Sequence, residues 1–261
     1  MADFSLIIVS HNHPELLKEA IQCVQDQTLQ KWEAVLVDSG ILLEKGFFKK
    51  VTDPRIKVIP SGETPGMGRT VNMASYCFNK VLNSGMLTGE LVMYLCDDDL
   101  LYKEAFETFW NYYIQHKREP QAMYGSQNLA VVDRSGKTKI IGKRIADRPG
   151  GKFCKGRKMD CQVDNLQFCH TLAILKKFKE VYKTDQYQSE AKEDAWHADG
   201  IFFEQIGALT KIHNINKLVS VNRRTATSAN LEYSDNAVGR FLITAKNKFK
   251  GLKKKLASNR R

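Results

Sequence analysis

Short apolar runs that alternate with helical patterns constrain the fold of this chain more than any other feature of its sequence. Residues 4–9 are apolar and bounded by polar residues, a pattern typical of a strand buried on both faces of a parallel sheet. Pro14 begins a helical pattern, at a first turn where its missing N–H costs nothing. A second apolar run covers residues 34–37. Strand, helix and strand in this order predict a βαβ unit.

The alternation continues along the chain. It predicts strands at 56–59 and 91–95, a glycine-rich turn at 65–68, and helices at 71–82 and 106–113. This order predicts an α/β fold, a Rossmann-related doubly wound sheet whose ligands bind beyond the carboxyl ends of the strands. Asp38 follows one of these strands, and Asp97, Asp98 and Asp99 follow another. We therefore expect these four carboxylates at the ligand-binding edge.

The second half of the sequence has a different character. Residues 129–132 and 138–141 flank a turn and predict a β-hairpin, and a glycine- and lysine-rich loop follows at 148–158. Because no low-complexity linker separates the halves, we expect added α+β elements on one sheet.

Composition excludes several classes of protein. The chain has 261 residues, of which 43% are hydrophobic, a composition typical of a globular protein. A chain of this size can form a stable core without disulfide bonds or a structural metal. The six cysteines include no CxxC pair, so neither a zinc site nor a disulfide framework is predicted. No apolar run approaches the ~18 residues of a membrane span. We expect a soluble, cytoplasmic protein.

The formal charge of +11 is concentrated at the C-terminus, where residues 240–261 carry nine basic residues and no acid. The near-neutral remainder argues against a nucleic-acid partner. Residues 237–261 form a basic amphipathic tail, with apolar residues at helical spacing. Two interpretations stay open for this tail. It contacts an anionic membrane, at the inner face of the membrane, or it packs its apolar stripe on the domain.

Three consecutive aspartates after a buried strand are electrostatically costly. They imply either a divalent cation or full solvent exposure, because neighbouring carboxylates raise one another's pKa. The position of Asp97, Asp98 and Asp99 at a strand end favours the cation, and an all-oxygen site suits Mg²⁺ or Mn²⁺.

Four motifs together resemble the family 2 glycosyltransferases of the GT-A fold. The helix that begins near Pro14 ends in Gln27-Thr28, and the following strand ends in Asp38, as in that family. The segment 95–100, Leu-Cys-Asp-Asp-Asp-Leu, falls where the family has its DxD metal motif, and the segment 192–196, Lys-Glu-Asp-Ala-Trp, is similar to its later Glu-Asp motif.

The resemblance implies an inverting, metal-dependent transfer of a sugar from a UDP- or dTDP-sugar. The acceptor would be a hydroxyl of a carbohydrate, a lipid-linked molecule or a protein, and the cofactor Mn²⁺ or Mg²⁺. Asp97 and Asp99 would bind the metal. The implied nucleotide-sugar-binding residues are Val9, Ser10, His11, Asn12, Asp38, Arg69, Asp97 and Asp98. The resemblance also implies a GT-A domain over residues 1–236, with a nucleotide-binding half at about 1–118 and an acceptor half at about 119–236.

Asp194 would be the general base that takes the proton of the acceptor hydroxyl. An alternative is that Asp194 is an acidic residue favoured at the start of a helix. Glu193, Trp196 and His170 are candidates for the acceptor side, and for His170 and Trp196 a structural role is the alternative.

Three positions depart from the family pattern. Ser39 and Cys96 replace frequent aspartates, and Thr225 stands where a histidine is common in a segment like Val221-Asn-Arg-Arg-Thr225. If that histidine ligates the metal, this chain must use Arg223, Arg224 or water. Two other functions remain open: a catalytically silent sugar-nucleotide binding module and, from the tail alone, a basic membrane or nucleic-acid adaptor.

Overall fold

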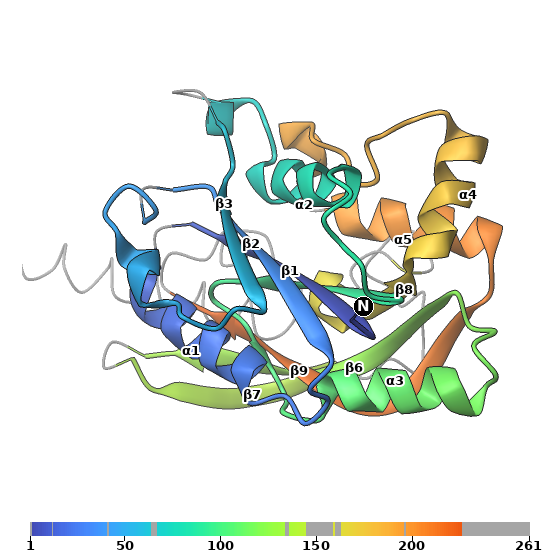
Figure 1. Ribbon diagram of the computed structural model, residues 1–261, viewed down its shortest axis with the longest axis horizontal. Coiled ribbons are helices and arrows are strands. Elements are labelled where there is room, and N and C mark those ends of the chain that lie inside the picture. Colours follow the sequence, from blue (N-terminus) through green and yellow to red (C-terminus); the bar gives the residue numbers. More distant parts are fainter. Residues whose placement is uncertain are drawn as a thin grey trace, which may run out of the picture.

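A single mixed sheet organises the molecule, with helices on both of its faces (Figure 1). The structure is a computed structural model that describes residues 2–11, 13–40, 42–63, 67–133, 136–144, 159, 163–195 and 197–225, without the side chain of Arg69. Within these ranges nine strands form the sheet, in the order β3-β2-β1-β4-β8-β6-β9-β5, and β7 pairs with β6.

The first half of the sheet is parallel. Its strands are β1 (Phe4–Ser10), β2 (Trp32–Asp38), β3 (Ile56–Pro60) and β4 (Leu91–Cys96). β1 lies between β2 and β4, and its Val9 pairs with Val37 on one side and Cys96 on the other. The carboxyl ends of these three strands therefore meet at one edge, and the predicted alternation of strands and helices is confirmed.

Helices cover both faces of this sheet, as Figure 1 shows. On one face lie α1 (Pro14–Gln25) and α3 (Ala105–Gln115), and on the other α2 (Met73–Asn83), α4 (Leu172–Tyr182) and α5 (Ala198–Leu209). Side chains of β1 alternate between the two layers: Leu6 and Ile8 pack on the α1 side, and Ile7 and Val9 on the α2 side. This alternation confirms a doubly wound sheet, because both faces of each central strand are buried.

The added half extends the same sheet. Its strands are β5 (Leu100–Leu101), β6 (Ala122–Val132), β7 (Thr138–Arg144), β8 (Phe168–Thr171) and β9 (Ile212–Arg224). The predicted hairpin is β6 and β7, but β6 begins well before residue 129 because it also pairs with β8 and, in parallel, with β9. The long strand β9 reaches the loop after β4 through β5, where Leu100 pairs with Val221.

Short 3₁₀ helices complete the described structure: η1 (Phe47–Lys50), η2 (Met67–Arg69), η4 (Asn165–Gln167) and η5 (Lys192–Asp194). None of the helices in the described ranges has the length and apolar character to cross a lipid bilayer. Cys23, Cys77, Cys96 and Cys169 are free thiols. Cys154, Cys161, the whole predicted loop at 148–158 and the tail at 237–261 lie outside the described residues.

Candidate functional site

Asp38 lies at the carboxyl end of β2, beside the end of β1. Ser10 Oγ donates a hydrogen bond of 2.8 Å to Asp38 Oδ1, and the Leu43 N–H donates one of 2.8 Å to Oδ2. Ser39 donates to the Ser10 carbonyl from both its backbone N–H and its Oγ, each over 2.9 Å. These bonds fix the orientation of a buried carboxylate that retains capacity to accept further bonds.

Asp97 connects the end of β4 to the turn after β1. The His11 N–H donates to Asp97 Oδ2 over 2.6 Å, and His13 Nδ1 lies 3.3 Å from Oδ1. The hydrogen bond with Asp97 raises the pKa of His13. Val9 contributes its carbonyl, which accepts from the Asp97 N–H over 3.0 Å, while its side chain is in the core. Asn12 lies outside the described residues.

His13 is a site residue that the sequence analysis missed. Its position just before Pro14 gave a signal, since it belongs to the same turn as His11. The imidazole of His11 also reaches the end of β2, with Nδ1 3.1 Å from both the carbonyl and the Oγ of Ser39. The turn after β1 is thus tied to both neighbouring strand ends.

Arg223 of β9 supports the loop of Asp98 and Asp99 from behind. Its backbone N–H donates to Asp99 Oδ1 over 2.7 Å, and its Nε donates to the Asp98 carbonyl over 2.6 Å. The guanidinium also donates to the Glu19 carboxylate and, over 3.3 Å, to the carbonyl of Leu16, both on α1. Arg223 is 1% exposed. Its buried guanidinium therefore joins β9 and α1 to the loop of residues 97–99, which we call the aspartate loop.

The aspartate loop concentrates negative charge. Burial, with the charge of Asp97, raises the pKa of Asp98 to about 6. Burial also raises the pKa of Asp99 well above its usual range, and the nearby charges of Asp98 and Asp164 add to the effect. Such pKa shifts arise where fixed negative charge is incompletely balanced, and hard oxygen donors of this kind fit Mg²⁺ or Mn²⁺.

The predicted metal ligands Asp97 and Asp99 have different surroundings. Asp97 faces the turn of His11 and His13, whereas Asp99 faces β9, where Asn222 Nδ2 lies 3.5 Å from Asp99 Oδ2. Among the described residues, no three histidine, cysteine, aspartate or glutamate side chains converge as a metal site requires. Asp97 and Asp99 therefore stay predicted ligands that are held by different elements.

Asp194 ends the one-turn helix η5. Its Oδ2 accepts a hydrogen bond of 2.7 Å from Ser189 Oγ, and its carbonyl accepts from the His197 N–H over 2.8 Å. The side chain is partly exposed. His197 is the N-cap residue of α5, so Asp194 precedes that helix rather than lying in its first turn.

The segment before Asp194 is fixed to the start of α2. Ala191 forms a β-bridge with Val71, and the Asn72 N–H donates to the Glu190 carbonyl over 2.8 Å. Asn79 Nδ2 also donates to the carbonyl of Gln188 over 2.7 Å. These contacts bring the candidate base to the segment that follows η2, which contains Arg69.

The remaining acceptor-side candidates are dispersed. Glu193 is exposed in η5, and Trp196 lies outside the described residues. His170 is in the core rather than at the acceptor side: it is 0% exposed, its Nε2 lies 2.6 Å from the Tyr94 hydroxyl, and burial lowers its pKa to about 4. It pairs with Val92, near the start of β4 and away from the strand's carboxyl end. His170 therefore has the structural role that was its alternative.

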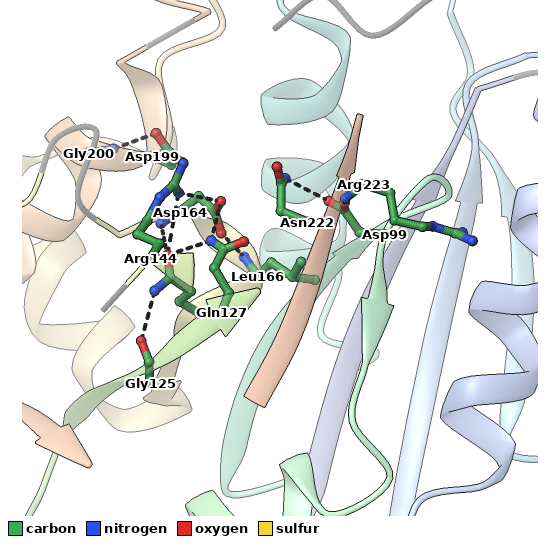
Figure 2. Close-up of polar contacts among 11 residues, drawn as sticks. Asp99, Gly125, Gln127, Arg144, Asp164, Leu166, Asp199, Gly200, Asn222 and Arg223 are labelled. Carbon is green, nitrogen blue, oxygen red and sulfur yellow. Dashed lines mark hydrogen bonds and ion pairs between the residues drawn. The ribbon is translucent and has the colours of Figure 1, made fainter. Parts of the chain in front are cut away.

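A second polar cluster lies on the other side of β9 from Arg223 (Figure 2). Asp164 Oδ2 accepts from Arg144 Nη1 over 2.7 Å and from Gln127 Nε2 over 2.6 Å. Burial raises the pKa of Asp164, and Arg144 opposes that shift. The sequence analysis missed this cluster because its members come from β6, β7 and the N-cap of η4, which share no motif.

Comparisons with known proteins show a family match over the first part of the chain and a shared fold. The family model described as glycosyl transferase family 2 matches residues 5–119. Protein CgeD of Bacillus subtilis (strain 168) is 25% identical over 228 residues, which are 86% of this chain and 50% of that protein. The chain therefore spans about half the length of this curated relative.

Two solved structures show the same fold. TarS of S. aureus (residues 1–349), in complex with UDP-GlcNAc, is 15% identical, with a TM-score of 0.61 over 90% of this chain and 62% of that one. The mannosyltransferase PcManGT of Pyrobaculum calidifontis, in complex with GDP-Man and Mn²⁺, is 13% identical, with a TM-score of 0.51 over 87% of this chain and 59% of that one. The expected GT-A-like fold is confirmed.

Proposed function

We propose that this chain is a member of glycosyl transferase family 2, whose model matches residues 5–119, and that it transfers a sugar from a UDP- or dTDP-sugar to an acceptor hydroxyl, with inversion at the anomeric carbon. The observation that carries the proposal is that Asp38, Asp97 and Asp99 lie at or just after the carboxyl ends of neighbouring parallel strands. Structural neighbours in complex with UDP-GlcNAc and GDP-Man support a nucleotide sugar as the donor class.

The end of β1 and β2 is where we place the nucleoside. Asp38 is buried and already oriented by Ser10, so its remaining acceptor capacity suits the hydroxyls of a ribose or the N–H groups of a base. The hydrogen bond from the His11 N–H to Asp97 connects this site to the end of β4. We also assign Asn12 and Arg69 to donor binding, on the family pattern alone.

The diphosphate belongs over the loop of Asp98 and Asp99. Asp97 and Asp99 would hold a Mn²⁺ or Mg²⁺ ion, which when bound would supply positive charge next to the departing nucleoside diphosphate. Arg223 holds Asp99 in place through its backbone N–H and holds the loop through the Asp98 carbonyl. This support is preorganised, which is what a site for developing charge requires.

Asp194 is the general base in this proposal. Ser189 engages Oδ2, which orients the carboxylate and leaves Oδ1 to accept the proton of the acceptor hydroxyl. The acceptor oxygen then bonds to the anomeric carbon as the bond from that carbon to the diphosphate oxygen breaks. Attack from the face opposite the leaving group inverts the anomeric configuration.

Two further expectations stay proposals. We assign residues 1–236 to the transferase domain, divided near residue 118. We also propose that the tail at 237–261 holds the protein at the cytoplasmic face of an anionic membrane, because nine basic residues lie in its last part.

A thermal-shift screen of nucleotide sugars, with and without Mn²⁺, tests the proposed function. We expect stabilisation by a UDP- or dTDP-sugar, worth about 2.7 kcal/mol at 100 times its dissociation constant. Donor hydrolysis is then measured with the same sugar. A shift without turnover indicates the silent binding module, and no shift with any nucleotide sugar contradicts the proposal. Asp38→Asn should remove the shift, whereas Asp53→Asn, a carboxylate paired with Arg55 before the start of β3, should keep it.

A further inference from the structure

The side chains of Asn222 and Arg223, which are neighbours in β9, point to opposite sides of the strand beside the aspartate loop. The Arg223 side chain extends to α1, and the Asn222 side chain turns to the other side, where its Nδ2 lies 3.5 Å from Asp99 Oδ2 (Figure 2). Asn222 therefore faces the same carboxylate that the Arg223 backbone N–H holds in place.

The Asn222 amide is incompletely satisfied. Asn222 is 8% exposed, and its Oδ1 has no hydrogen-bond partner within the described structure. A buried carbonyl oxygen without a donor is unfavourable, so the fold retains it at a cost in stability. In this orientation Nδ2 donates to Asp99, and a half-turn of the amide would place the acceptor oxygen beside the carboxylate instead. Two oxygens in that arrangement do not suit an anion. They suit a cation.

We propose that Asn222 Oδ1 is a ligand of the divalent cation in this chain, beside the Asp99 carboxylate. The inference rests on the proposed function, because the diphosphate and water would supply the other ligands. Magnesium sites of this kind use one or two protein side chains together with substrate phosphates.

The geometry is compatible with shared coordination. The two ends of an asparagine amide exchange places on a half-turn, and this brings Oδ1 to the position now held by Nδ2, 3.5 Å from Asp99 Oδ2. Adjacent oxygen ligands in an octahedral shell with bonds of 2.0–2.1 Å lie about 3 Å apart. A shift of a few tenths of an ångström is therefore sufficient.

Thr225 stands where a histidine is common in the family, so another residue would have to replace that histidine as a metal ligand. Arg223 and Arg224 do not ligate a cation, since a guanidinium is always protonated and only donates. Arg223 is moreover committed to Glu19 and Leu16. Asn222 lies in the same segment, and its amide oxygen would take the place of the histidine.

Mn²⁺ binding to the full chain, without nucleotide, tests the assignment. The signal of free Mn²⁺ in electron paramagnetic resonance gives the dissociation constant. We expect Asn222→Ala to weaken binding about tenfold or more. Ser220→Ala is the matched control, because Ser220 Oγ is also buried without a partner in the described structure, two residues earlier on the same face of β9, and it should bind Mn²⁺ like the wild type.

A cysteine at position 222 tests direct ligation. Asn222→Cys should favour Cd²⁺ over Mg²⁺ and produce sulfur-to-cadmium charge-transfer absorption in the ultraviolet, because a thiolate is a soft ligand. Ser220→Cys should show no more of this absorption than the wild type. A residue that only positions Asp99 would not generate this spectroscopic signature.

Wild-type Mn²⁺ affinity in Asn222→Ala, or equal cadmium absorption in the two cysteine variants, would overturn the assignment. If Asn222→Ala lacks a cooperative thermal transition, Asn222→Asp replaces it, and affinity no higher than wild type then contradicts the assignment. A failed assignment leaves the proposed function intact if nucleotide sugars still stabilise the protein. Absence of that stabilisation is the separate failure of the proposed function.

Discussion

Asp99 and Asp194 are both predicted by motifs, yet the protein holds them in different ways. Asp99 is 7% exposed, and its carboxylate accepts from Arg223, which is 124 positions away in the sequence. Asp194 is partly exposed, and its carboxylate accepts from Ser189, which is five positions away. One site depends on the tertiary fold, and the other on a local turn.

The difference fits the role that we propose for each carboxylate. The aspartate loop keeps like charges together in a buried place, so it needs a scaffold that resists their repulsion. A general base needs to be oriented but also has to meet an acceptor that arrives from solvent. Changes around Asp99 should therefore alter stability and donor binding, whereas changes around Asp194 should alter turnover alone.

The largest expected effect is on turnover. Asp194→Asn should lower the rate of sugar transfer by 10²- to 10⁴-fold and leave the thermal transition and donor affinity unchanged, because only the proton acceptor is lost. Glu180→Gln, a carboxylate-to-amide change on the exposed side of α4, should have wild-type turnover. Wild-type turnover in Asp194→Asn would mean that another group takes the proton.

Arg223 should matter most for stability. Arg223→Met removes the donors to Asp98 and Leu16 and leaves buried acceptors unsatisfied, so urea unfolding should show a loss of about 3 kcal/mol. Glu19→Gln should cost at most about 1 kcal/mol, since the Glu19 side chain is 49% exposed. Equal losses of stability in the two variants would show that the bond to Glu19, rather than the bonds to Asp98 and Leu16, accounts for the loss.

His170 makes the free energy of unfolding depend on pH, which tests its structural role in the core. Burial lowers its folded pKa to about 4, below an unfolded value of about 6.5, so the unfolded chain binds a proton first and stability is lost as the pH falls from about 6.5 to 4. Between pH 7 and 5 this loss should be about 2 kcal/mol. His170→Gln should reduce it by that amount in urea titrations at the two pH values. The same pH dependence in both proteins would contradict the structural role.

The smallest effect is expected for the local support of Asp194. Ser189→Ala removes the hydrogen bond to the Asp194 carboxylate and the one that Oγ accepts from the Ala191 N–H, so it should lower turnover about tenfold and thermal stability slightly, without a change in donor KM. Ser189→Thr, which keeps the hydroxyl, should recover most of the rate. Unchanged turnover in Ser189→Ala would show that η5 alone orients the base.

The sequence predicts the parallel half of the sheet well because its signals are local. Buried strands are continuous apolar runs, and the helices between them have regular periodicity, so residues 4–9, 34–37 and 91–95 identify β1, β2 and β4. The carboxylates at their ends follow directly, since parallel strands end at one edge. Asp38 and the aspartate loop are therefore found without the structure.

The support of the site comes from contacts that no local pattern contains. Residues 221–225 carry a motif, but only the pairing of β9 with β5 and β6 shows that Arg223 and Asn222 point in opposite directions. The pairing of Asp164 with Arg144 likewise joins separate elements. His170 is polar in the sequence, but its burial beside Tyr94 depends on the packing of β8 on β4.

Calorimetric titration of uridine diphosphate tests the central claim most directly, which is that the strand ends of β1, β2 and β4 hold a cation-bound diphosphate. The wild type is titrated in Mn²⁺ and in EDTA, and Asp99→Asn in Mn²⁺. The account predicts binding in Mn²⁺ that weakens about tenfold or more in EDTA and in Asp99→Asn, because the charge of the diphosphate is then uncompensated. Equal affinity in all three titrations would contradict it.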